Sequence, residues 1–184
     1  MIRRVLTGAT LAAVTAVWAT ASVPVDAGKS HIRATFTQMS VDVDADFRQF
    51  SGQVSYDPAA PEQGTAKLQI QTASFDIGDE EYNAEVRKAE WLDSETHPEA
   101  VFESTTIEPL GEDRFKATGT LSLKGRTETV SSEITVRTQG GHRHFSGSLP
   151  ISRKTFSIGD AEWDEVLEDR VTVKFTIVVP ATSS

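Results

Sequence analysis

The chain contains no cysteine among its 184 residues. This absence excludes disulfide bonds, thiolate nucleophiles, cysteine-ligated zinc and iron–sulfur clusters. It also excludes the acylated cysteine by which a bacterial lipoprotein is anchored. Any catalytic or metal chemistry must therefore come from other side chains.

Basic residues are few as well, since 18 Lys and Arg stand against 27 Asp and Glu, for a formal net charge of -9. A nucleic-acid binder usually shows the opposite balance, so polyanions are poor candidate partners. The hydrophobic content of 38%, beside 24% charged residues, is enough to build a core. The length is that of one domain.

The first residues have the pattern of an export signal. Met1–Arg4 is basic, residues 5–18 are apolar, and Ala19–Ala21 supplies the small residues that signal peptidase requires. We expect a signal peptide over residues 1–21, with a second cleavage option after Ala27, and a single domain over residues 22–184. The alternative is a membrane anchor, but this interrupted run is barely long enough to cross about 30 Å of hydrocarbon.

Export of a cysteine-free domain favours one compartment. Small domains on the eukaryotic secretory route are usually stabilised by disulfides, so a Gram-negative periplasm fits better. We expect a mature periplasmic protein with no integral membrane span. The single pair Arg3-Arg4 leaves the choice between general and twin-arginine export open.

From residue 31 onward, apolar residues recur at every second position, which is the period of a half-buried strand. Ile32, Ala34 and Phe36, for example, alternate with polar neighbours. Further runs of this kind cover residues 41–47, 50–56, 66–71, 115–123, 130–136, 145–151 and 171–179, with a less regular strand over 101–107. Short turn sequences separate most of them, which indicates antiparallel neighbours.

One segment breaks this period. Residues 79–93 are rich in Glu, Ala, Lys and Arg and place Tyr82, Val86 and Ala89 at helical spacing. We therefore predict an all-β fold with one short α-helix. The strands are expected to form an antiparallel, up-and-down barrel of about eight strands, whose interior holds side chains or one small ligand.

Candidates for catalysis and metal binding are weak. His142 and His144 share one face of a strand, but a closed zinc site needs about four ligands. Asp42, Asp44 and Asp46 resemble the start of a calcium loop, yet the loop's glycine and terminal glutamate are missing, so the outer face of a strand is the better interpretation. We expect no enzyme, no cofactor and no metal.

Several segments of the sequence resemble those of a known protein family. They are Phe47-x-x-Phe50-Ser51-Gly52, Ala73 to Gly78, Glu81 to Asp93, His97-Pro98 to Thr105, Gly119 to Thr127, Phe145-Ser146-Gly147 and Ile151 to Gly159. In order and spacing, the chain resembles the YceI family of exported, lipocalin-like proteins over nearly all of its expected mature length. The resemblance implies a periplasmic barrel whose lumen takes a polyisoprenoid or a similar long amphiphilic lipid. The family's helix and the loop over residues 153–163 are expected near the opening.

The expected binding site has two parts. Lumen residues would hold the apolar tail, and mouth residues would face the head group with an aromatic collar and hydrogen-bond donors. The lumen set is Phe36, Phe47, Leu68, Ile70, Phe75, Phe102, Leu121, Phe145 and Phe175; the mouth set is Tyr82, Asn83, Arg87, Trp91, Arg153, Phe156 and Trp163.

Two other functions stay open at this point. One is a structural or stress-related barrel whose lumen is filled by its own side chains, and the other is a metal-dependent catalyst. Residues 37–44 also depart from the hydrophobic, histidine-rich stretch of many family members, so the identity of the lipid does not carry over. A homodimer is left open as well.

Overall fold

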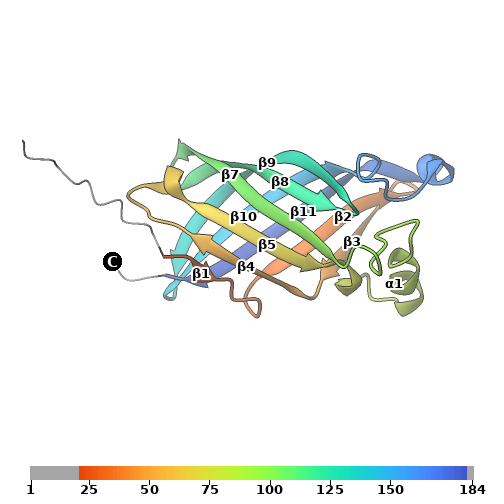
Figure 1. Cartoon of the computed structure of the whole chain (residues 1–184), viewed down its shortest axis with the longest axis horizontal. Helices are drawn as coiled ribbons and strands as arrows, with labels where there is room; N and C mark the ends of the chain where they lie inside the picture. Colours follow the sequence, from red (N-terminus) through yellow and green to blue (C-terminus); the bar gives the residue numbers. More distant parts are fainter. Residues whose placement is uncertain (1–20, 182–184) are drawn as a thin grey trace, which may run out of the picture.

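The computed structural model describes residues 21–181, which form a twisted antiparallel sheet with one α-helix (Figure 1). The predicted signal peptide lies almost wholly outside these residues. The strands are β1 (Val23–Pro24), β2 (His31–Gln38), β3 (Val41–Phe47), β4 (Phe50–Ser55), β5 (Thr65–Gln71), β6 (Phe75–Asp76), β7 (Glu99–Gly111), β8 (Arg114–Leu123), β9 (Arg126–Gln139), β10 (His142–Ser152) and β11 (Leu167–Pro180). The helices are α1 (Glu80–Val86) and the 3₁₀ turns η1 (Pro61–Gln63), η2 (Thr72–Ser74) and η3 (Ala161–Glu165).

The strands pair in the order β1-β4-β5-β7-β8-β9-β10-β11-β2-β3-β6. In three cases, two strands that follow each other along the chain form one longer ribbon: β1 with β2, β3 with β4, and β5 with β6. Phe50 of β4 lies opposite Ile70, and Phe47 of β3 lies opposite Phe75, so the β3–β4 ribbon pairs twice with the same neighbour. The eleven described strands are thus eight ribbons, which close because β11 also pairs with β2. The predicted barrel is confirmed.

Four two-residue turns account for the up-and-down order. They lie at residues 39–40, 112–113, 124–125 and 140–141, and both residues of each turn have positive φ. This backbone matches type I′ hairpin turns, whose twist suits the flanking strands. Met39 (φ 50°) and Ser40 (φ 65°) adopt it without glycine.

The outer face of the barrel carries paired polar side chains. Arg33 Nε donates to Asp46 Oδ1 at 2.7 Å, and Thr35 Oγ1 donates to Asp44 Oδ1 at 2.6 Å. Asp42 accepts from Thr37 Oγ1 at 2.8 Å. The three aspartates therefore pair with β2 across the outer face of β3, as the alternation predicts, and do not form a calcium loop.

The helix is shorter than the sequence pattern suggests. Asp79 caps α1 by accepting from the backbone N–H groups of Glu81 and Tyr82, but the helix ends at Val86 rather than near Asp93. Beyond it the chain turns back, since the Leu92 N–H donates to the Val86 carbonyl at 3.0 Å. This turn buries Trp91 and Leu92, and their burial overrides the continued helical spacing.

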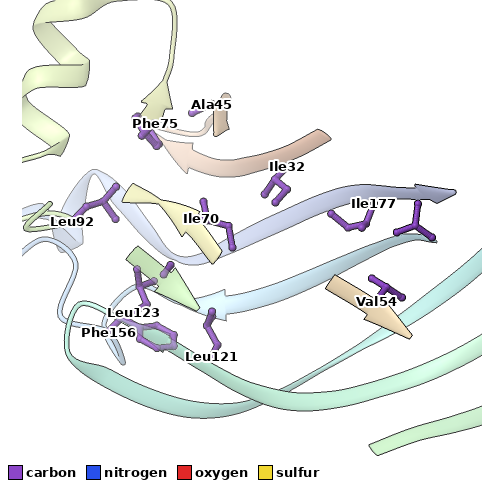
Figure 2. Packing of buried hydrophobic residues seen from close by; sticks show 12 residues of the cluster. Ile32, Ala45, Val54, Ile70, Phe75, Leu92, Leu121, Leu123, Phe156 and Ile177 are labelled. Carbon is purple, nitrogen blue, oxygen red and sulfur yellow. The ribbon is translucent and has the colours of Figure 1, made fainter. Parts of the chain in front are cut away.

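The core lies inside the barrel. Figure 2 shows side chains of the buried cluster projecting inward from different strands, among them Ile32, Ile70, Leu121 and Ile177. Strand β8 shows the cause, because its inward residues 115, 117, 119, 121 and 123 are buried and those between them are more exposed. Among the described residues, no helix is long and apolar enough to cross a membrane.

Candidate ligand-binding site

The barrel encloses a cavity of about 730 Å³. Cavities of roughly 300 to 1,000 Å³ are the usual size for sites that enclose a small molecule. All nine side chains predicted to line the lumen do line it. The lumen is therefore only partly filled by the protein's own side chains.

The lining also contains residues that were not singled out from the sequence. They are mainly inward positions of the same strands, such as Ile32, Ala34, Val54, Ala66, Ala117, Ile134, Val136, Leu149, Ile151, Val171, Val173 and Ile177. The signal for most of them was present, because they continue the same period of two.

Aromatic side chains pack against one another at the end of the barrel where β11 finishes. The Tyr56 ring meets Phe115 and Phe145 edge to face, with ring centroids 5.8 and 5.3 Å apart. Arg143 lies over the Tyr56 ring at 5.3 Å, a cation–π contact, and is only 9% exposed. Burial raises the pKa of the Tyr56 hydroxyl, so this group stays neutral.

Helix α1 and the β10–β11 connection, residues 153–166, lie at the other end (Figure 1). Of the seven side chains predicted at this mouth, Tyr82, Trp91, Arg153 and Trp163 line the cavity, whereas the other three do not. Phe156 is one of those three: it is 1% exposed and belongs to the buried core. Its predicted place at the mouth is corrected accordingly.

The spacing of α1 explains the two remaining corrections. Glu81, Tyr82, Glu85 and Val86 form one helix face and line the cavity, so residues 83 and 87 fall on another face. The side-chain amide of Asn83 is used within the protein, where Oδ1 accepts from the Ile77 N–H and Nδ2 donates to Asp76, both at 3.0 Å.

Arg87, like Asn83, holds α1 in place from the helix face that points away from the cavity. Its Nε donates to the Ala73 carbonyl at 3.0 Å, and its Nη1 pairs with Glu80 at 2.8 Å. Asn83 and Arg87 therefore fix α1 against the β5–β6 ribbon, and neither aims a donor at the cavity.

Arg153 does line the cavity, but four of the five N–H donors of its guanidinium bond within the protein. Nε donates to the Glu168 carbonyl at 3.1 Å and Nη1 to the Ile158 carbonyl at 3.1 Å. Nη2 donates to Asp164 Oδ1 at 2.6 Å and to the Leu167 carbonyl at 3.0 Å. The side chain is 1% exposed, so four of its five N–H donors order the β10–β11 connection and it is poorly placed to bind a head group.

Two of the three aromatic side chains predicted to form a collar at the mouth are in contact with each other. The Trp91 and Trp163 rings meet edge to face with centroids 4.9 Å apart, and Trp163 Nε1 donates to Glu90 at 2.6 Å. Tyr82 is 46% exposed, and its hydroxyl accepts a long 3.4 Å contact from Gln38 Nε2. The mouth thus presents apolar rings with polar edges.

His142, one of the two histidines considered for a metal site, contacts other groups. His142 Nε2 lies 3.2 Å from Lys29 Nζ, and its Nδ1 lies 2.9 Å from the Gly140 carbonyl. Within residues 21–181, no group of three or more His, Asp or Glu side chains is placed to hold a metal ion.

Solved structures share this architecture. The crystal structure of Burkholderia cenocepacia BcnA is 41% identical, covers 84% of this chain and 99% of its own, and superposes with a TM-score of 0.82. A polyisoprenoid binding domain from Saccharophagus degradans, described as implicated in plant cell wall breakdown, is 20% identical with a TM-score of 0.70, over 86% of this chain and 98% of its own. The second likeness shows the fold alone.

Sequence relatives agree with the structural ones. A UPF0312 protein of Azotobacter vinelandii (strain DJ / ATCC BAA-1303) is 37% identical over 118 residues, which are 61% of this chain. The chain spans 62% of that relative's length. The model of the YceI-like domain family matches residues 24–179, from β1 to β11, and confirms the resemblance carried by the motifs. This chain therefore belongs to the YceI-like family.

Proposed function

We propose that this protein is a binding or carrier protein that holds a polyisoprenoid, or a similar long-chain amphiphilic lipid, in its barrel lumen. The observation that carries the proposal is the cavity of about 730 Å³, lined almost entirely by apolar side chains. The Saccharophagus degradans neighbour, described as a polyisoprenoid binding domain, supports this choice of ligand.

The tail alone supplies enough free energy for binding. Each CH₂ group removed from water contributes about 0.8 kcal/mol, so ten buried groups contribute about 8 kcal/mol before the costs of association. A dissociation constant near 1 μM requires about 8 kcal/mol net, so a chain of about twenty buried carbons, worth about 16 kcal/mol, leaves about 8 kcal/mol for those costs. The lumen needs no polar contact to hold a longer chain.

Binding, rather than catalysis, fits the distribution of charge in the lining. The carboxylates of the lining, Asp79, Glu81 and Glu85, lie on or beside α1. The Arg153 guanidinium donates its hydrogen bonds to groups within the protein. Deeper in the lumen, the strands present mainly apolar side chains to a ligand.

We also propose that the protein works in the periplasm after cleavage following Ala21. The basic, apolar and small-residue segments over residues 1–21 support export. Cleavage after Ala27 would remove β1, which pairs with β4. It would also remove Asp26, whose N–H donates to the Val178 carbonyl at 2.8 Å. N-terminal sequencing of protein from the periplasmic fraction tests both statements; a full-length membrane-bound product contradicts them.

Native mass spectrometry of freshly purified protein, followed by geranylgeraniol titration, tests the proposed ligand. Leu121, which is 7% exposed and lines the lumen, is replaced in Leu121→Trp to block the cavity. Leu110→Trp makes the same exchange at a site that is 42% exposed and outside the lining. Ala117→Phe blocks the lumen at another level if the first variant does not fold.

We expect a co-purifying or added lipid to bind the parent protein and Leu110→Trp, and to bind the lumen variants at least tenfold more weakly, about 1.4 kcal/mol. Equal binding by a folded Leu121→Trp would show that the lumen is not the site. A parent protein that carries no lipid and takes up none would favour the structural alternative instead.

A further inference from the structure

Apart from one arginine whose charge is compensated inside the protein, the charged side chains that line the cavity are all acidic. Four lining side chains carry a formal charge: Asp79, Glu81, Glu85 and Arg153. Arg153 is buried against Asp164 and three backbone carbonyls, so its charge is already compensated. The remaining three are acids at the mouth.

These acids are compensated to different degrees. Glu85 pairs with Lys88, and the Asp79 carboxylate accepts the two N–H groups that it caps. Glu81 makes no ion pair with any other residue in the described part of the chain, and it is exposed on the helix face that lines the cavity. A ligand head at this mouth therefore meets at least one free carboxylate.

The same mouth contains three aromatic rings. Tyr82, Trp91 and Trp163 all line the cavity, and the two tryptophan rings are in contact. The faces of aromatic rings attract cations, and several rings beside a carboxylate are a common arrangement for binding ammonium groups. Aromatic ring faces and carboxylates both attract positive charge, so both favour a ligand with a cationic head.

We propose that the mouth selects amphiphiles with a cationic head, such as a protonated amine, over those with an anionic head such as a phosphate. This inference rests on the proposed function, because the tail must occupy the lumen for the head to reach the mouth. Carboxylates repel a phosphate and attract an ammonium group, and no free cation in the described lining offsets this difference.

Three ligands with one tail test the selectivity: geranylgeraniol, geranylgeranylamine and geranylgeranyl phosphate. Their dissociation constants are measured by displacement of a fluorescent apolar probe at neutral pH. Glu81→Gln removes the free carboxylate at the mouth. Glu108→Gln removes the same charge from an exposed site on β7 outside the lining.

We expect the amine to bind most tightly and the phosphate most weakly. The amine–phosphate ratio should fall about threefold in Glu81→Gln, the scale of one exposed charge pair, and stay unchanged in Glu108→Gln. It should also shrink as ionic strength rises from about 0.01 M to 0.15 M, where screening shortens from about 30 Å to 8 Å.

Three results would overturn the inference, and they can be told apart. If the alcohol binds in the lumen and the phosphate binds as tightly as the amine, the charge selectivity is wrong and the carrier function stands. If none of the three ligands binds, the proposed function fails with it. An equal effect of both glutamine variants would attribute the preference to net charge and also overturn the assignment to the mouth.

Discussion

Replacing Arg153 with methionine removes the group that holds the β10–β11 connection together. Methionine has a similar length but no donor, so the carbonyls of Ile158, Leu167 and Glu168 lose this donor, and Asp164 keeps only its pair with Lys154. Because Asp164 is 37% exposed, the loss comes mainly from the carbonyls; a buried acceptor left without a donor costs about 1 to 3 kcal/mol, so we expect about 3 to 5 kcal/mol for the three together. In a chain of this size, that loss lowers the unfolding midpoint by about 6 to 20 °C.

The assay follows two signals during thermal unfolding. Circular dichroism reports on the barrel, and tryptophan fluorescence reports on the contacting pair Trp91 and Trp163, of which Trp163 lies within the connection that Arg153 orders. We expect the fluorescence transition of Arg153→Met to move to lower temperature at least as far as the dichroism transition, because the loop loses its contacts directly. Binding should weaken as well, since Trp163 lines the mouth.

Lys154→Met is the matched control. Lys154 Nζ pairs with the same carboxylate, Asp164, at 2.8 Å, but its side chain is 50% exposed. Exposed pairs contribute little, so the midpoint should stay nearly unchanged. If the two methionine variants melt at the same temperature, the buried network is not what stabilises this connection and the reasoning is refuted.

Two further predictions concern the barrel wall. Gly119→Ala should lose about 1 to 3 kcal/mol of unfolding free energy in urea titrations, because overpacking forces neighbours to shift. Its Cβ would lie 2.4 Å from the Glu103 carbonyl oxygen and 2.7 Å from the Phe102 ring. Gly28→Ala, with no contact under 3.4 Å, should change little, and equal losses would contradict this. Separately, the Arg33 hydrogen bond holds the pKa of Asp46 below its usual range. The stability it contributes is complete above the unfolded pKa of about 3.9 and is lost as pH falls through the folded pKa. Asp46→Asn should flatten that part of the acid unfolding curve, and an unchanged curve would disprove the linkage.

The lumen could be predicted from the sequence because it depends on one local rule. In a strand, side chains alternate between two faces, so Phe36, Leu68 and Leu121 had to share a face with their neighbours at every second position. Closing the sheet places that face inside the barrel whatever the details of the turns. A small error in strand bounds leaves the inward register intact.

The mouth could not be predicted in the same way, because it depends on where one short helix stops and how it is rotated. Composition and spacing predict a helix that continues to Asp93, yet burial of Trp91 and Leu92 ends it at Val86. A helix turns by about 100° per residue, so neighbouring positions face different surroundings. Glu81 and Tyr82 consequently face the cavity, whereas Asn83 faces Asp76.

The two ends of the barrel differ in a way that orients a ligand. At the end near Tyr56, aromatic rings and the buried Arg143 pack against one another, and no carboxylate of the described residues lines the cavity there. At the α1 end, the half-exposed Tyr82 and the free carboxylate of Glu81 stand beside the lumen and in contact with solvent. A charged head keeps its hydration only at the second end, since burying an unpaired charge is costly. Under the proposed function, the apolar tail would therefore enter first and point toward Tyr56, and the residues of α1 would select the head.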